Sequence, residues 1–166
     1  MQRNCVFVTG CEMTADLEIR KASREDLPAI VALFANDRLG GHGDTTDAAA
    51  FDDYVSAFEK IEASAHQALY VACLKGEIVG TFQTAISTSL PGRGSSSLII
   101  EAVQTREDMR GRGIGERMVR HAIAEAREKG AAKVRLTSNI ARIDAHRFYE
   151  RLGFERSHFG FKMQVK

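Results

Sequence analysis

The sequence predicts a single α/β domain built on a mixed β-sheet. Three observations support this prediction: the chain length, the alternation of strand and helix patterns, and the lack of repeats or low-complexity linkers. The chain has 166 residues, of which 44% are hydrophobic and 27% are charged, which is ordinary for one soluble globular domain. The patterns follow the order β-α-α-β-β-β-α-β-α-β, and such alternation is typical of α/β folds.

The first elements are a short strand and a helix with a recognisable start. Residues 17–20 alternate between apolar and polar side chains, as a half-buried strand does. Ser23 and Asp26 then form a capping-box pattern, with Asp in place of the usual Glu, so a helix is expected to follow. The glycine-rich segment 39–44 ends that helix in a loop.

A second helix and a pair of strands come next. Asp47 is suited to cap the helix, whose apolar face is formed by Phe51, Tyr54, Val55 and Phe58 at helical spacing. Residues 69–74 and 78–87 are apolar runs joined by a Lys-Gly-Glu turn, which predicts two antiparallel strands.

The second half of the chain is predicted to alternate strands with helices. In order, we expect a buried strand over 97–105, a glycine loop over 111–115, a helix ending at Gly130, a strand over 133–136, a helix over 141–151 and a last strand over 159–163. The helix after the loop carries Ile114, Met118, Ala122, Ile123 and Ala126 on one face.

The charge distribution is balanced overall and uneven along the chain. The formal net charge is +1, with −6 on residues 1–90 and +7 on residues 91–166. A basic half favours an anionic ligand. Its arginines fall in a predicted helix and a glycine loop rather than in a basic stripe with aromatic side chains, which argues against a nucleic-acid partner. No apolar run reaches the roughly 20 residues of a membrane span.

The cysteine pattern indicates free thiols in a reducing compartment, the cytoplasm. Cys5, Cys11 and Cys73 are odd in number and lack metal-site spacing, and no histidines and acids show a convincing spacing for a metal ion. The apolar stretch before Cys11 is shorter than a signal peptide requires. Residues 1–12 are expected to form a disordered tail, because Met13 suits a second start, and residues 13–166 to form the domain.

The segment Arg110–Gly115 has the features of a phosphate-binding loop. Its three alternating glycines let the backbone come close to a ligand, and it opens a predicted helix whose N-terminus is partially positive. Arg110 and Arg112 add two positive charges, so a pyrophosphate is the expected ligand. The spacing fits neither a P-loop nor a dinucleotide fingerprint. A glycine-rich turn without a ligand is the alternative.

Two motifs carry a resemblance to a known family. Arg110–Gly115 matches the R/Q-x-x-G-x-G/A loop, and Asn139 with residues 145–154 matches N…A-x-x-F-Y-x-x-x-G-F. Both occur in the right order, so the chain resembles the GNAT acetyltransferase superfamily. Residues 144–159 are similar to those of aminoalkylphosphonate N-acetyltransferases.

The resemblance implies a fold and a reaction. The fold is a strongly twisted, mixed, mostly antiparallel sheet, splayed between strands 4 and 5 and flanked by about four helices. The reaction is transfer of an acetyl group from acetyl-CoA to a primary amine of a small molecule, by direct attack in a ternary complex. The superfamily often forms homodimers. Two alternatives remain: a protein lysine or N-terminal acetyltransferase, and a non-catalytic acyl-CoA-binding module.

The resemblance also implies which residues hold acetyl-CoA. The pyrophosphate would lie against the backbone of Arg110, Gly111, Arg112, Gly113, Ile114 and Gly115. Backbone groups of Val103, Gln104 and Thr105 would pair with the pantetheine arm, so their side chains are expected to matter little. Asn139 would donate a hydrogen bond to the same arm, and a helix cap is its alternative role.

Glu101 and Tyr149 are the predicted catalytic residues. Glu101 interrupts an apolar run, where a buried carboxylate is costly without a role; it is the candidate base, and contact with solvent or an arginine is the alternative. The resemblance implies that the backbone N–H of Val103 binds the oxyanion. The resemblance makes Tyr149 the acid that protonates the leaving thiolate, and core packing is its alternative. The resemblance also implies that His42 and Asp44, together with Glu101, face the acceptor amine, and a mobile surface loop is the alternative for His42 and Asp44.

Overall fold

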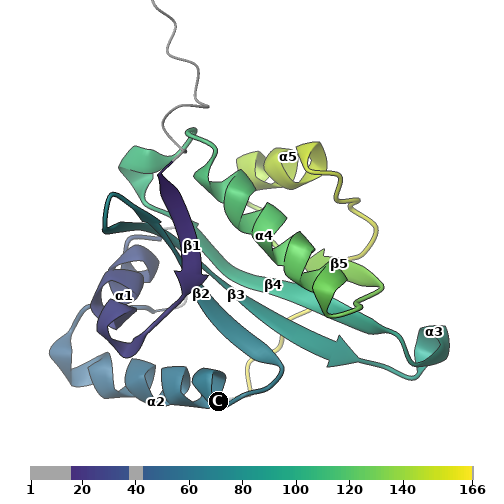
Figure 1. Cartoon of the computed structure of the whole chain (residues 1–166), viewed down its shortest axis with the longest axis horizontal. Helices are drawn as coiled ribbons and strands as arrows, with labels where there is room; N and C mark the ends of the chain where they lie inside the picture. The colour runs from purple at the N-terminus through teal and green to yellow at the C-terminus, as the bar shows by residue number, and fades with distance from the viewer. Residues whose placement is uncertain (1–15, 38–42, 166) are drawn as a thin grey trace, which may run out of the picture.

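The computed structural model describes residues 16–37 and 43–165, which form one five-stranded sheet with helices on both faces (Figure 1). The expected tail 1–12 lies outside these residues. Neighbouring strands are antiparallel except for the last pair, β4 and β5, which is parallel. The sheet has the order β1-β2-β3-β4-β5, with strands at Leu17–Lys21, Gln67–Leu74, Glu77–Thr88, Ser96–Thr105 and Lys133–Leu136. The predicted mixed, mostly antiparallel sheet is therefore confirmed.

Two groups of helices cover the two faces of the sheet. The α-helices are α1 at Leu27–Ala35, α2 at Phe51–Glu62, the short α3 at Pro91–Gly94, α4 at Ile114–Glu128 and α5 at Ile143–Arg151. Helices α1 and α2 lie on one face, and α4 lies on the other (Figure 1). Within the described residues, no helix is long and apolar enough to cross a membrane.

The alternation of side chains along β2 explains why the sheet has two cores. Leu69, Val71 and Cys73 pack with α1 and α2, whereas Ala68, Tyr70 and Ala72 pack with α4. Successive side chains of a strand point to opposite faces. A strand that is apolar at nearly every position must therefore be covered on both sides, and the two helix layers provide that cover.

The helix predictions rested on spacing and capping, and both are visible in the structure. Four residues of the predicted α4 face, Ile114, Met118, Ala122 and Ala126, are at most 3% exposed. The Asp47 carboxylate accepts a hydrogen bond from the Ala49 N–H over 3.0 Å, and the short 3-10 turn Ala48–Ala50 then leads into α2. Helix α5 begins at Ile143, two residues later than predicted.

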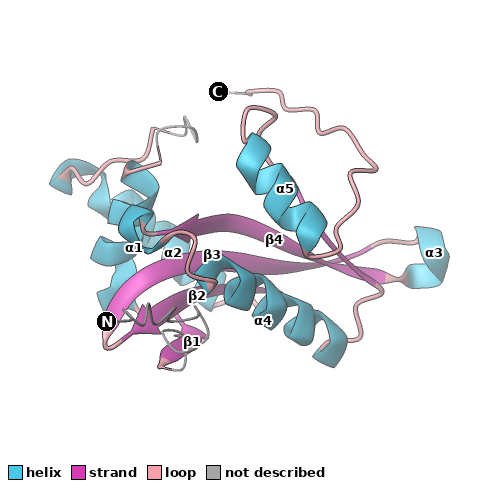
Figure 2. Ribbon diagram, turned by 90° about the horizontal axis from the view of Figure 1, so that it is seen from above, coloured by secondary structure: helices cyan, strands magenta, loops and turns pink. Residues whose placement is uncertain are grey.

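The predicted last strand over 159–163 is wrong. Residues 154–165 contain no strand in the structure and run on from α5 as a loop (Figure 2). Phe159, Phe161 and Met163 alternate as strand residues do, yet they are 90%, 96% and 83% exposed. Alternation predicts only which side chains would share a face. A strand also needs a neighbour with which to pair, and the only strand paired with β5 in the described chain is β4.

Strand β4 is buried only in its first half, so the prediction of a buried strand over 97–105 is half wrong. Its parallel pairing with β5 runs from Ser97–Lys133 to Ile100–Leu136 and stops there. Just beyond, Ala102 has a left-handed φ of 52°. The register against β3 shifts at this point. These features are those of a β-bulge, which bends a strand and increases its twist. Strands β4 and β5 therefore splay apart as predicted.

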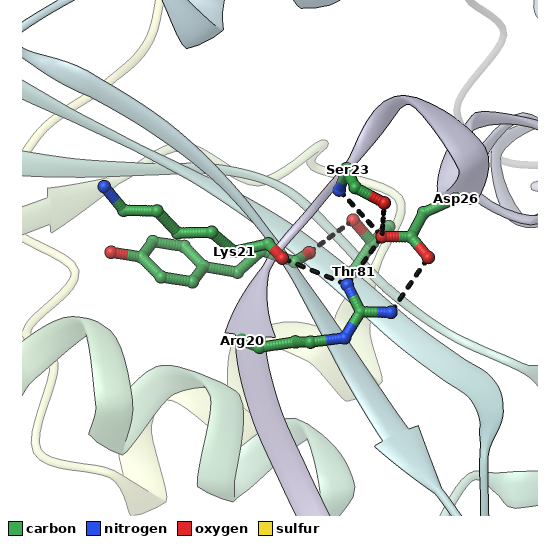
Figure 3. A network of polar contacts seen from close by, with 6 residues as sticks. Arg20, Lys21, Ser23, Asp26 and Thr81 are labelled. Atoms are coloured by element: carbon green, nitrogen blue, oxygen red, sulfur yellow. Dashed lines mark hydrogen bonds and ion pairs between the residues drawn. The ribbon is translucent and has the colours of Figure 1, made fainter.

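A polar network fastens the end of β1 to the start of α1 (Figure 3). Arg20 donates two hydrogen bonds to the Asp26 carboxylate, over 2.6 and 2.9 Å. The same carboxylate accepts the Ser23 N–H over 2.8 Å, as the capping pattern predicts. The hydrogen bonds from Arg20 are the main reason that the pKa of Asp26 lies below its usual range, and burial opposes them. The ionised form of Asp26 therefore stabilises the fold.

We expect Asp26→Ala to lower the free energy of unfolding by about 2–3 kcal/mol, because Arg20 and the Ser23 N–H lose a charged partner. Urea unfolding at pH 7 measures this loss. The matched control is Arg24→Ala, which removes a surface ion pair with Glu59 and should change stability by less than about 0.5 kcal/mol.

The stabilisation by Asp26 should also depend on pH in a defined direction. Since folding depresses the pKa of Asp26, its stabilisation is complete above the unfolded pKa of about 3.9 and is lost as the pH falls through the folded value. The stability gap between wild type and Asp26→Ala should therefore close in acid. A gap that stays constant down to pH 2 would contradict this assignment.

Candidate active site

The splay between β4 and β5 is the centre of the candidate site. Glu101 is the first residue of β4 beyond the last pair with β5, and its side chain is exposed. The expected burial of Glu101 is therefore wrong as an argument for a catalytic role. In this structure its carboxylate contacts solvent, as the alternative proposed. Its position remains notable. Glu101 lies opposite Gln83, and Gln104 lies opposite Thr81, so Glu101 and Gln104 share the sheet face that α1 and α2 cover.

The glycine loop has a backbone that a phosphate can approach. Gly111 and Gly113 have left-handed φ values of 74° and 81°, and no atom lies within 4 Å of the position that a Cβ would take at either residue. Gly113 is the N-cap of the 15-residue α4. The loop is held to the end of β4, because Arg110 Nε donates to the Thr105 carbonyl over 3.2 Å. An open turn of this kind at a helix N-terminus suits an anion.

Gly115 allows three elements to meet beside the loop. A Cβ at Gly115 would lie 3.4 Å from Phe148 Cζ and 3.8 Å from Thr105 Oγ1. Helix α4, helix α5 and the far end of β4 are therefore neighbours at this point. Ile114 is 2% exposed, so its side chain serves the core and not a ligand. Arg112 is exposed, and its charge helps to keep the pKa of Asp108 low, after the larger effect of Arg106.

A cavity lies between the end of α1 and the loop that follows β4. Its volume is about 420 Å³. It includes two of the predicted acetyl-CoA residues among its lining side chains, which are Leu33, Asn36, Thr105, Arg106, Glu107, Asp108 and Arg110. The cavity therefore borders the glycine loop on the side of α1.

Asn139 organises the turn between β5 and α5. Its Oδ1 accepts the Ala141 N–H over 2.9 Å, and its carbonyl accepts the Arg142 N–H over 2.9 Å. His146 Nε2 lies 2.9 Å from the same carbonyl. The Asn139 side chain therefore closes this turn and does not cap helix α5, whose N-cap is Arg142, so the alternative role of a helix cap is wrong. The contact uses Oδ1 only, so the Nδ2 group of Asn139 is the part of the side chain that could donate to a ligand.

Tyr149 combines aromatic packing with a phenol near a positive charge. Its ring contacts Phe148 and Phe154 edge-on, with centroids 5.0 and 5.8 Å apart. Burial raises the pKa of the phenol above 10, and the guanidinium of Arg142 partly offsets this rise. The hydroxyl is therefore protonated at neutral pH and lies within the electrostatic reach of Arg142.

A polar cluster that the sequence did not reveal spans the same region. We define it as Asp37, Gln104 and Arg142. Gln104 Nε2 donates to Asp37 Oδ2 over 2.6 Å, and Arg142 Nη2 donates to the same oxygen. The Gln104 side chain therefore has a polar partner of its own, which the sequence did not predict. The partners are 67 and 105 residues apart in the chain, so no local pattern marks them.

The predicted acceptor residues are only partly described. His42 lies outside the described residues. The Asp44 carboxylate accepts a hydrogen bond from the Tyr54 phenol over 3.1 Å, and the same phenol oxygen accepts the Thr45 N–H. Asp44 thus contacts α2. Among the described residues, no group of three His, Cys, Asp or Glu side chains is placed to hold a metal ion.

Comparisons with known proteins identify relatives of the chain. Residues 27–154 match the profile described as acetyltransferase (GNAT) family. Aminoalkylphosphonate N-acetyltransferase of Salmonella typhimurium is 35% identical over 144 residues, which cover 87% of this chain and 88% of the relative. L-methionine sulfoximine/L-methionine sulfone acetyltransferase of Pseudomonas aeruginosa is 29% identical over 145 residues, with coverages of 84% and 80%.

A solved structure agrees over nearly the whole fold. The crystal structure of a transcriptional regulator from Bacillus halodurans C-125 is 40% identical in sequence and has a TM-score of 0.86. The match covers 90% of this chain and 99% of that protein. The similarity therefore extends well beyond the two motifs.

We expect the phenol of Tyr149 to titrate above pH 10, since burial raises its pKa. Arg142→Gln should raise that pKa further, because it removes the positive charge that favours the phenolate. The absorbance of phenolate, taken as wild type minus Tyr149→Phe, isolates this group from the other two tyrosines of the chain. A Tyr149 titration that does not move in Arg142→Gln would contradict the contact.

Proposed function

The chain belongs to the GNAT acetyltransferase family and is an acyltransferase, and from this premise we propose that it transfers an acetyl group from acetyl-CoA to a primary amine of a small molecule. The observation that carries the proposal is the end of the β4–β5 pairing at Ile100 and Leu136. Beyond Ile100, the backbone N–H and C=O groups on this edge of β4 have no partner in β5. An extended ligand can pair with such an edge as a further strand does.

The neighbours of this edge support acetyl-CoA as the donor. Gly111 and Gly113 form an open turn at the N-terminus of α4, where backbone N–H groups and the helix dipole favour a pyrophosphate. Arg110 and Arg112 supply positive charge. The pantetheine arm would run from this loop along Val103, Gln104 and Thr105 toward Glu101. The glycine loop and the β4 edge therefore suit one long, polyanionic molecule.

The relatives support a small molecule as the acceptor. The Salmonella typhimurium relative is named for aminoalkylphosphonates, and the Pseudomonas aeruginosa relative for L-methionine sulfoximine and L-methionine sulfone. Each aligns with more than four-fifths of this chain. A reducing compartment, the cytoplasm, is part of the proposal, because Cys73 is a free and buried thiol.

The proposed chemistry is direct attack of the amine on the thioester in a ternary complex. An alkylammonium has a pKa near 10, so Glu101 would accept its proton, directly or through water. The nitrogen then forms a bond to the carbonyl carbon, and the Val103 N–H would donate a hydrogen bond to the oxygen that becomes negative. The bond from carbon to sulfur breaks, and the Tyr149 phenol would supply a proton to the sulfur.

The surroundings of Tyr149 suit the role of an acid. A coenzyme A thiol resembles a cysteine thiol, with a pKa of about 8.5. Burial keeps the phenol protonated until it is needed, and Arg142 prevents its pKa from rising further above that of the thiol. The positive charge of Arg142 also stabilises the phenolate that the transfer leaves behind. Solvent then reprotonates Tyr149.

We expect Gly113→Ala to weaken coenzyme A binding by about tenfold or more. Its φ of 81° strains any residue with a Cβ by about 1 kcal/mol or more, and relief of that strain would move the N–H groups that face the phosphates. Isothermal titration with coenzyme A measures the effect. Gly76→Ala is the matched control, because Gly76 has a φ of 83° and equally open surroundings in the β2–β3 turn. Equal losses of affinity in both variants would refute the phosphate-binding loop.

The function is tested by acetyl-CoA-dependent thiol release with a panel of amines. The panel contains aminoalkylphosphonates, polyamines, aminoglycosides, amino acids and lysine peptides. We expect turnover with small amines and little with peptides. Wild-type protein that binds coenzyme A and releases thiol with none of these amines would contradict the proposal.

In the same assay, Tyr149→Phe should lower kcat by about 100-fold, the usual contribution of a general acid, with a nearly unchanged KM for acetyl-CoA. Tyr70→Phe is the control, because Tyr70 stacks on Phe82 in the core on the α4 side, and its kcat should remain near wild type. An unaltered kcat in Tyr149→Phe would remove this residue from the mechanism.

A further inference from the structure

The polar cluster of Asp37, Gln104 and Arg142 joins three segments across the splay. Asp37 follows α1, Gln104 lies on β4 beyond its bulge, and Arg142 immediately precedes α5. The Arg142 and Asp37 side chains are only 24% and 11% exposed. Two side chains donate to a single carboxylate oxygen of Asp37. The geometry of the guanidinium is therefore fixed by its surroundings.

The cluster lies between the two residues proposed for proton transfer. Glu101 and Gln104 face the same side of the sheet, and the bulge at Ala102 makes them successive residues on that face, about 7 Å apart along the strand. On the other side, the charge of Arg142 acts on the phenol of Tyr149. Arg142 is thus a largely buried guanidinium, paired with Asp37, near both residues proposed for proton transfer.

A cation at this position has a consequence for the acceptor. An acceptor enters as an ammonium, which Glu101 attracts. Asp37 balances much of the charge of Arg142, but it contacts only the N–H groups of Nη2, whereas a guanidinium carries five N–H donors in a planar fork that matches an oxyanion. A molecule that bears an anionic group near its amine would place its ammonium at Glu101 and its oxyanion at the remaining donors of Arg142.

We propose that the acceptor is a zwitterion, an amine that carries an oxyanion group two or three bonds away, and that Arg142 binds this oxyanion. The inference rests on the proposed function and assigns the acceptor class for that site. Asp37 and Gln104 position the guanidinium, Arg142 selects the substrate, and Glu101 receives the ammonium end. A carboxylate, a sulfonate and a phosphonate share the chemistry that the fork recognises.

The test compares acceptors that differ only in the group beside the amine. The panel is β-alanine, taurine and 2-aminoethylphosphonate as zwitterions, ethanolamine as a neutral-tailed amine and 1,3-diaminopropane as a dication. Initial rates give kcat/KM for each in wild type, Arg142→Gln and Arg142→Lys. The control is Arg147→Gln, whose side chain is 68% exposed on α5. Circular dichroism melting verifies that each variant folds.

We expect wild type to favour at least one zwitterion over both ethanolamine and 1,3-diaminopropane by about tenfold or more, since hydrogen bonds between charged groups typically have this effect. Arg142→Gln should reduce that ratio to about one, chiefly through a higher KM. Arg142→Lys should keep part of it, because a lysine retains the charge without the fork. The ratio is the informative quantity, because any effect of Arg142 on Tyr149 acts on all acceptors alike.

Two outcomes overturn the inference in distinguishable ways. Acetylation of ethanolamine and the zwitterions with equal kcat/KM, or a preference that survives in Arg142→Gln, would refute the role of Arg142 and leave the acetyltransferase function intact. The absence of thiol release with every amine would refute both, because the zwitterions belong to the panel. Among the three zwitterions, the best acceptor identifies the oxyanion.

Discussion

The end of the β4–β5 pairing at Ile100 and Leu136 is the constraint on which the site depends. A parallel pair that continued along β4 would close the sheet and leave no edge for a ligand. Strand β5 ends at Leu136, and just beyond the last pair the bulge at Ala102 bends β4, at the cost of a left-handed φ of 52° in a residue with a Cβ, typically about 1–2 kcal/mol. The antiparallel partners β2 and β3 hold the rest of β4 in register. The sheet therefore tolerates the strain locally and gains an opening.

Each segment at the opening brings a different chemical property. The loop before α4 contributes unobstructed backbone and arginines, and α5 contributes the phenol of Tyr149 in an aromatic environment. The end of α1 contributes the carboxylate of Asp37. Gly115, which lies beside Phe148 and Thr105, keeps these segments close enough to serve one ligand. A Cβ there would still fit, in ordinary contact with Phe148, whereas a longer side chain would press on this ring.

Local patterns predicted most of the fold because most of it is determined locally. The apolar face of α4, the Asp47 cap and the strand over 133–136 follow from neighbours within a few positions. The predicted strand over 159–163 failed because pairing is not a local property: its alternation is real, and the described chain offers it no partner. The prediction that all of β4 is buried failed for the same reason, since burial of a strand depends on the elements that pack beside it.

The candidate site likewise has one part that local sequence patterns reveal and one part that they do not. The glycine loop is recognisable because its function resides in consecutive residues with special backbone geometry. The polar cluster is not, because Asp37, Gln104 and Arg142 become neighbours only after the sheet has formed. Asp37 comes from the acidic half of the chain, and Arg142 comes from the basic half. The uneven charge along the sequence thus becomes, after folding, a pair of opposite charges near the residues proposed for proton transfer. Under the proposed function, a site with this polarity would distinguish molecules by the arrangement of their charges and not only by their net charge.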